Sequence, residues 1–165
     1  MTRIALNGLG RIGKLALRAV IEDGLPGELV LLNDPVGTPE QHAMLLEFDT
    51  VHGRWPAAFG HGPNMLSVNG HEMRLTAASR IEDLPLAEMG IDLVIDCTGV
   101  FKTAEKIAPY FDAGVKKVVV SAPVKDGGAL NVVYGVNHDL FDPGAHDIVT
   151  AASCTTNCLA PVVKV

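Results

Sequence analysis

The sequence has few cysteines, a single tryptophan and no long apolar run. Its three cysteines, Cys97, Cys154 and Cys158, are too few for a disulfide framework, and free thiols fit a reducing cytoplasm. No apolar stretch reaches about 18 residues, so no segment is expected to span a membrane. The first residues lack the basic and apolar regions of a secretory signal. A net charge of −6 gives no electrostatic reason to bind nucleic acid or an anionic membrane.

The composition is that of a globular domain, and the residue pattern predicts strands that alternate with helices. Apolar residues make up 48% of the chain and charged residues 19%. Apolar runs predict strands at 3–7, 29–33, 92–98, 117–121, 131–134 and 148–150. Helical spacing predicts helices at 14–22, 38–46 and 103–111 and a last helix capped by Ser153. This order predicts an α/β fold, a Rossmann-type doubly wound, mostly parallel sheet.

Turn signals refine this prediction. Thr38 is expected to cap its helix, with Pro39 at the first helical position. The segment 65–75 alternates around Asn69-Gly70, which predicts a hairpin excursion from the parallel sheet. Glycine and proline clusters at 60–63 and 127–128 indicate loops.

A glycine-rich loop, G-L-G-R-I-G, follows the first strand and opens the first helix. In this context Gly8 permits a tight turn, Gly10 lets the backbone approach a pyrophosphate, and Gly13 lets the helix pack on the strand. Asp34 ends the next strand, where a carboxylate would bind the adenosine ribose and repel a 2′-phosphate, which favours NAD over NADP. The alternative is a purely structural glycine turn, with Asp34 as a cap.

Cys154 is predicted to lie in the first turn of the last helix. The partial positive charge of a helix N-terminus favours thiolate over thiol, and a thiolate is a strong nucleophile towards a carbonyl. Two other readings stay open from the residues alone: a small buried hydrophobe, or a redox pair with Cys158. Cys97, on a buried strand, and Cys158 are expected to be structural. The spacing of the two helical cysteines is poor for zinc, and no metal site is expected.

The histidines and the tryptophan are weaker signals. Trp55 is expected to pack in the interior, and His52 to have a packing role in its loop. The other histidines lie in polar or loop stretches and are expected at the surface: His42, His61, His71, His138 and His146.

Seven segments together resemble the glyceraldehyde-3-phosphate dehydrogenase family, over the whole chain. They are N-G-L-G-R-I-G-K (7–14), N-D (33–34), F-D-T-V-H-G-R-W (48–55), C-T-G-V-F (97–101), V-V-S-A-P (119–123), G-V-N (135–137) and A-S-C-T-T-N-C-L-A-P (152–161). The S-C-T-T-N-C segment is highly specific, and the resemblance implies that Cys154 is the catalytic nucleophile.

The resemblance also implies the other site residues. Those that would bind NAD are Asn7, Gly8, Gly10, Arg11, Ile12, Asp34, Arg80, Thr98, Gly99, Phe101 and Ser121. Ser153 and Thr155 would flank the substrate. Cys154 would attack the aldehyde, hydride transfer to NAD would leave a thioester, and phosphate would release the acyl phosphate.

Departures from the family pattern point to a particular branch. Pro35 follows Asp34 where the family usually has leucine or threonine, which relaxes the expected strictness of NAD over NADP. The sequences at 33–55 and 149–165 resemble those of a bacterial branch associated with arsenic resistance. There arsenate replaces phosphate and a partner permease exports the product. The small-molecule partners implied are glyceraldehyde 3-phosphate with phosphate or arsenate, and the full-length assembly implied is a cytoplasmic homotetramer.

The resemblance divides the chain at the last helix. Residues 1–152 are expected to be the NAD-binding domain, and 153–165 the first helix leading into a catalytic domain absent from this chain. The histidine that the family pairs with its nucleophile would then lie beyond Val165, so these residues alone are expected to turn over little or nothing. Two alternatives are erythrose-4-phosphate dehydrogenase and a stand-alone NAD-binding module without chemistry.

Overall fold

The computed structural model describes residues 1–165. Its strands are β1 (Arg3–Asn7), β2 (Glu28–Asn33), β3 (Phe48–Asp49), β4 (Gly53–Arg54), β5 (Phe59–Gly62), β6 (Met65–Val68), β7 (His71–Thr76), β8 (Leu93–Asp96), β9 (Lys117–Val120), β10 (Leu130–Asn131) and β11 (Ile148–Thr150). Its helices are α1 (Arg11–Asp23), α2 (Pro39–Glu47), α3 (Ala104–Asp112) and α4 (Cys154–Lys164), with short 3₁₀ turns at Ile81–Asp83 and His138–Leu140.

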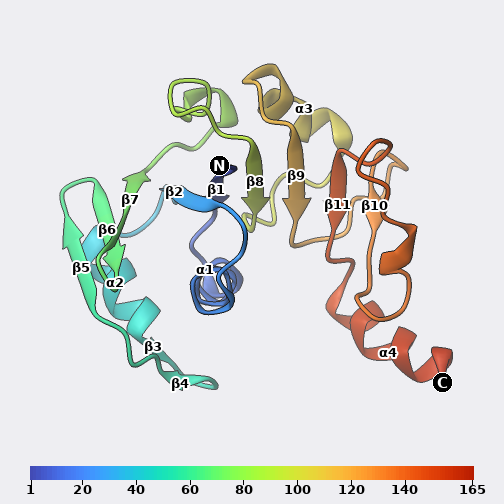
Figure 1. Cartoon of the computed structure of the whole chain (residues 1–165), viewed down its shortest axis with the longest axis horizontal. Helices are drawn as coiled ribbons and strands as arrows, with labels where there is room; N and C mark the ends of the chain where they lie inside the picture. Colours follow the sequence, from blue (N-terminus) through green and yellow to red (C-terminus); the bar gives the residue numbers. More distant parts are fainter.

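Nine strands form one sheet in the order β10-β11-β9-β8-β1-β2-β7-β6-β5 (Figure 1). From β10 to β7 every neighbouring pair is parallel, and β7-β6-β5 continue as an antiparallel meander. A separate two-stranded ladder, β3-β4, lies outside this sheet. The predicted α/β fold with a mostly parallel sheet is therefore confirmed.

Two hydrophobic clusters cover the two faces of the sheet. One joins α3, through Ile107 and Tyr110, to inward-facing residues of the central strands. The other joins α1 and α2 to the opposite face, through Leu17 and Leu46. Along β1, Ala5 belongs to the first cluster, and its neighbours on the strand belong to the second. This alternation explains why the strands read as continuous apolar runs, because both faces of a parallel sheet are covered.

Most predicted elements form within a residue or two of their expected bounds. Thr38 caps α2 as predicted, and its hydroxyl accepts from the Gln41 N–H at 3.2 Å. Asn69 and Gly70 both have positive φ, 52° and 81°, as a two-residue hairpin turn with a type I′ backbone requires.

Two local expectations are wrong. The segment 60–63 was expected to be a loop, but most of it lies in β5, because the edge of the hairpin offers backbone partners to a glycine-rich stretch. The strand expected at 131–134 ends after Asn131, since the Val133 N–H is instead bound by the Asn137 side chain at 2.7 Å. The short β3-β4 ladder was not among the predicted elements.

The order of strands reverses at β1. The chain passes from β1 to β2 and β7 on one side, and then returns to β8 on the other. Ligands of open α/β sheets bind in the crevice at the carboxyl ends of the strands at such a switch point. None of the helices combines the length and the apolar character that crossing a membrane requires.

Candidate cofactor and active site

The glycine loop joins β1 to α1 at the switch point. Gly8 has φ of +95°, and a Cβ there would lie 2.7 Å from the backbone of Cys97 and Thr98. A Cβ on Gly13 would lie 1.8 Å from the Gly8 carbonyl oxygen. Gly10 has no atom within 4 Å of such a Cβ, so it borders open space. Two glycines are thus required by packing, and the third leaves room for a ligand to approach the backbone.

Asp34 follows β2 and faces the glycine loop. Its Oδ2 accepts from the Leu9 N–H at 2.7 Å, and its Oδ1 accepts from the Val36 N–H at 2.9 Å. The Lys14 ammonium donates to the carbonyl of Leu9, the residue whose N–H binds Asp34. Burial lowers the pKa of Lys14, and the charge of Asp34 opposes this shift. The carboxylate is therefore held in a fixed orientation beside the loop.

A cleft of about 230 Å³ lies at the carboxyl ends of β1 and β8. Its lining includes the predicted residues Asn7, Gly8, Gly10, Asp34, Arg80, Thr98 and Phe101. Pro35, which the sequence tied to the preference for NAD, lines it too. Residues that sequence reasoning did not assign to the site also line it: Ala78, Ser79, Cys97 and Val100. The turn at 78–79 could have been found only from the pairing of β7 beside β2.

Four predicted cofactor residues lie outside this lining. Ile12, in the first turn of α1, is 58% exposed, and Gly99 is exposed in the turn after β8. The Ser121 N–H donates to the Asp96 carbonyl at 2.8 Å, which places it at the end of β9. The Arg11 side chain points away, towards Asp49. For Arg11 and Ile12 the predicted contact is through the backbone, which their position at the helix N-terminus leaves possible.

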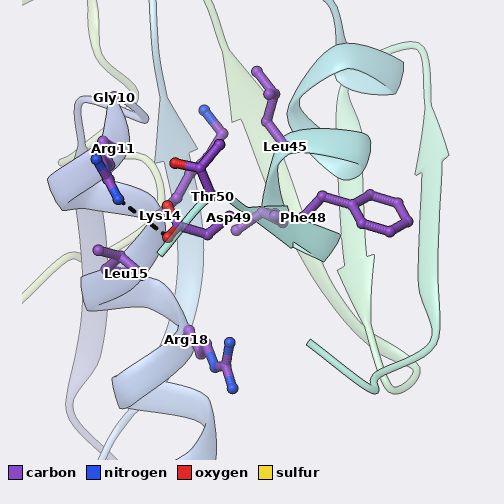
Figure 2. A pocket seen from close by; sticks show the side chains of 10 residues that line it. Gly10, Arg11, Lys14, Leu15, Arg18, Leu45, Phe48, Asp49 and Thr50 are labelled. Atoms are coloured by element: carbon purple, nitrogen blue, oxygen red, sulfur yellow. Dashed lines mark hydrogen bonds and ion pairs between the residues drawn. The ribbon is translucent and has the colours of Figure 1, made fainter. Parts of the chain in front are cut away.

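A second pocket, of about 360 Å³, lies between α1 and α2 (Figure 2). Arg11 reaches across it to the Asp49 carboxylate at 3.2 Å. The same carboxylate oxygen accepts from the Val51 and His52 N–H groups at 2.8 Å and lies 3.0 Å from His52 Nδ1. These hydrogen bonds hold the pKa of Asp49 well below its usual range. His52 therefore helps to fix its loop by hydrogen bonds to Asp49, with an exposed side chain rather than the packing role predicted for it.

His42 is buried rather than exposed, which contradicts the surface position predicted for it. It is 4% exposed, because α2 packs on the sheet with the face that carries His42, Ala43 and Leu46. Neither ring nitrogen has a hydrogen-bond partner. Burial, and the nearby charge of Lys14, lower the pKa of His42, and Asp34 opposes the shift. Trp55, by contrast, is 3% exposed and packs with Phe59, as predicted.

Cys154 is the first residue of α4, as predicted, and it is exposed. The preceding residue, Ser153, caps the helix, and its Oγ accepts from the Thr156 N–H at 3.1 Å. Ala152, before the cap, is buried with φ of 54°, a left-handed conformation that is uncommon for alanine. Ser153 and Thr155 line a pocket of about 750 Å³. The turn after β11 thus presents the thiol at a helix N-terminus.

The other two cysteines differ from each other. Cys158 is exposed, so the structural role predicted for it is wrong: α4 extends beyond the end of the sheet and buries none of its residues (Figure 1). Cys97 is half-buried, and burial raises the pKa of its thiol to about 11. It packs near Gly13, in agreement with its predicted structural role, and also borders the cleft.

A parallel sheet, a glycine loop at its switch point and an acidic residue at the end of β2 define a dinucleotide-binding α/β domain of the Rossmann type. The model of the family described as "Glyceraldehyde 3-phosphate dehydrogenase, NAD binding domain" matches residues 2–104. The chain belongs to this family, and NAD is its cofactor. The open space at Gly10 and the oriented Asp34 carboxylate fit this cofactor.

Curated relatives match the chain over almost all of its length. It is 48% identical to "Glyceraldehyde-3-phosphate dehydrogenase 3" of Nostoc sp. (strain PCC 7120), over 99% of this chain and 48% of the relative. It is 46% identical to the glyceraldehyde-3-phosphate dehydrogenases of Xanthobacter flavus and Kitasatospora aureofaciens, over 99% and 100% of this chain and 48% and 49% of the relatives. The chain therefore spans about half the length of the curated relatives it matches.

Proposed function

We propose that this chain is the nucleotide-binding half of an NAD-dependent, phosphorylating glyceraldehyde-3-phosphate dehydrogenase. Residues 1–152 would form the NAD-binding domain, and 153–165 the first helix that leads into a catalytic domain. The observation that carries the proposal is the position of Cys154, exposed at the N-terminus of α4 at the end of the same sheet that forms the cofactor cleft. The relatives' shared name supports the same assignment.

The cleft residues would hold the dinucleotide by its adenosine half. Asp34 would accept hydrogen bonds from the ribose hydroxyls, since its orientation is fixed by the Leu9 and Val36 N–H groups. The backbone of Arg11 and Ile12 would face the pyrophosphate at the start of α1. Arg80, Thr98, Gly99 and Phe101 would border the adenine, and Ser121 the nicotinamide ribose. When bound, NAD supplies a hydride acceptor.

Cys154 would carry the covalent chemistry. Its thiolate would form an Sγ–C bond to the aldehyde carbon as the carbonyl π bond breaks, and the carbonyl oxygen would take a proton from a group that we place in the catalytic domain, giving a hemithioacetal. Loss of hydride to NAD, with loss of the hydroxyl proton to a base that we place in the catalytic domain, would leave a thioester. An inorganic oxyanion would attack the thioester carbonyl and release the acyl product and the Cys154 thiolate. Ser153 and Thr155, in the adjoining pocket, would contact substrate and oxyanion.

The oxyanion distinguishes two versions of this proposal. Phosphate would give an acyl phosphate, and arsenate, which is nearly isosteric, would give an acyl arsenate. The resemblance to the arsenic-resistance branch supports arsenate as a physiological acceptor. We also propose a homotetramer as the full-length assembly and the cytoplasm as its location, with which three free thiols are consistent.

The test is an assay of the full-length protein with NAD and glyceraldehyde 3-phosphate, followed by NADH absorbance. Phosphate and arsenate are supplied in separate reactions, and erythrose 4-phosphate replaces the substrate in a third. We expect NADH formation that depends on an oxyanion and disappears in Cys154→Ser. Oxidation that persists in this variant, or a stronger response to erythrose 4-phosphate, would overturn the proposal.

A further inference from the structure

Four neighbouring strands each end on a polar residue at the edge of the sheet where the cofactor cleft lies. Asp96 ends β8, Asn7 ends β1, Asn33 ends β2 and Thr76 ends β7. Adjacent members are partners in the register of the sheet: Asp96 with Asn7, Asn7 with Asn33, and Asn33 with Thr76. Asn7, Asn33 and Asp96 are at most 4% exposed. We name these four residues the strand-end row. Buried polar groups of this kind are costly unless each is hydrogen-bonded.

One half of the strand-end row is joined directly. Asn33 Oδ1 accepts from the Thr76 hydroxyl at 2.9 Å and from the Ala78 N–H at 2.8 Å. Asn33 Nδ2 donates to Asn7 Oδ1 at 2.8 Å and to the Ala78 carbonyl at 3.0 Å. The Ala78 N–H can only donate, so it fixes which atom of the Asn33 amide is oxygen, and the direction of the Asn33–Asn7 bond follows.

The other half is joined by a residue from outside the sheet. Tyr110 of α3 is 0% exposed, and its hydroxyl lies between the two strand ends. It accepts from Asn7 Nδ2 at 2.6 Å and donates to Asp96 Oδ2 at 2.7 Å. Asp96 Oδ1 accepts from the Thr98 N–H at 3.0 Å and from the Thr98 hydroxyl at 2.7 Å. Burial raises the pKa of Tyr110, so the hydroxyl keeps its proton to donate.

Tyr110 fits this place for a chemical reason. Asn7 Nδ2 is a donor and the Asp96 oxygen accepts, so the group between them must accept from one and donate to the other. A hydroxyl does both with a single atom. The ring also contacts the cleft, because it lies edge-on to Phe101 with ring centroids 6.3 Å apart.

Each member of the row is followed closely by a residue of the cleft. Gly8 comes after Asn7, Asp34 after Asn33, Ala78 two residues after Thr76, and Thr98 two residues after Asp96. The positions of these turns relative to one another are therefore set by the strand-end row. We propose that Tyr110 is a positioning residue for the dinucleotide: it does not touch the cofactor, but it closes the row that holds the four cleft turns in register. The inference rests on the assignment of the cleft to NAD.

The test is the substitution Tyr110→Phe in the full-length protein. It keeps the ring and its contact with Phe101 and removes only the bridging oxygen. An amide donor and a carboxylate oxygen then lose their buried partner, so we expect Kd for NAD to rise about tenfold. ADP-ribose, which lacks only the nicotinamide ring of NAD, should lose affinity by the same factor. In the assay KM for NAD should rise while kcat changes little.

Two further variants separate positioning from general loss of stability. Ile107→Val changes a residue that is also 0% exposed on α3 but belongs to no part of the row, so it should destabilise the fold and leave NAD affinity unchanged. Thr76→Val removes one of two donors to Asn33, so it should raise Kd by only about twofold.

Two outcomes would overturn the inference. One is a Kd for NAD in Tyr110→Phe within twofold of the parent protein, at a temperature where both are folded. The other is an equal loss of affinity in Ile107→Val at matched stability. NAD titration needs no aldehyde, so this result stands apart from the activity assay: absent aldehyde oxidation would refute the proposed reaction without deciding the role of Tyr110.

Discussion

Replacing the glycines of the loop one at a time separates folding from cofactor binding. In Gly13→Ala the new Cβ would meet the Gly8 carbonyl oxygen at 1.8 Å, where real Cβ atoms keep at least 3.0 Å. The loop and α1 must therefore move apart by about 1.2 Å, the difference between these distances. The obstacle is backbone, which cannot rotate away. Overpacking of this kind costs about 3 kcal/mol, a large part of the roughly 5–15 kcal/mol that stabilises a domain.

Gly10→Ala is the matched control. Gly10 has φ of −64° and ψ of −170°, which any residue adopts, and a Cβ there meets no atom within 4 Å. The free energy of unfolding should change by less than about 1 kcal/mol, the usual difference between glycine and alanine at a helix N-cap. The methyl group would nevertheless occupy the space through which the pyrophosphate approaches, so Kd for NAD should rise about tenfold or more.

The assays are urea unfolding followed by circular dichroism, and NAD titration by calorimetry. With a slope near 2 kcal/mol per molar urea, the midpoint of Gly13→Ala should fall by about 1.5 M, and that of Gly10→Ala should stay within a few tenths. An unchanged midpoint in Gly13→Ala would refute the packing argument. Unchanged NAD affinity in Gly10→Ala would refute the placement of the pyrophosphate.

Three other measurements test individual side chains. If the Asp34 carboxylate reads the ribose, Asp34→Ser should narrow the preference for NAD over NADP by about tenfold, in competitive titrations, because the repulsion of a 2′-phosphate is lost; an unchanged ratio would count against this role. His42 has a pKa lowered from its ordinary 6.5, so the unfolded chain binds more protons below that pH and stability falls as pH decreases. His42→Leu should remove this decline of the unfolding free energy, which is at most about 1.4 kcal/mol per pH unit, in unfolding experiments between pH 5 and 7. Identical pH profiles of stability in the variant and the parent protein would contradict this expectation. Alkylation at neutral pH, followed by peptide mass spectrometry, should label Cys154 before Cys158, which lies one turn further from the helix N-terminus. Cys97 should be labelled last, because its pKa is raised to about 11. Faster labelling of Cys158 than of Cys154 would contradict activation by the helix.

The fold was largely predictable because its signals are local. Runs such as 29–32 are apolar at every position, which is typical of a strand covered on both faces. Thr38-Pro39 and Asn69-Gly70 carry their cap and turn chemistry within a few residues. The errors fell where pairing with a neighbouring segment decides the backbone. Residues 60–62 form a strand because β6, which follows after a tight turn, pairs with them, and nothing in their own composition favours an extended ladder.

The same distinction applies to the candidate site. Gly8, Gly13 and Asp34 could be predicted because their chemistry follows from their place beside a strand end. His42 and Tyr110 could not, since one depends on which face of α2 meets the sheet and the other on a hydroxyl of α3 that enters between two strands.

The residues that line the cofactor cleft and the strand-end residues that fix their positions are thus under different structural constraints. Cleft residues such as Ser79 and Val100 follow the strand ends in the chain and take no part in the strand-end row. Asn7 and Asp96 are constrained from two sides, since each takes part in the strand register and in the hydrogen bonds of Tyr110. A substitution in the row therefore moves two turns together. For this reason the affinity of the cleft for NAD should depend on Tyr110, a buried helix residue that is not among those lining the cleft.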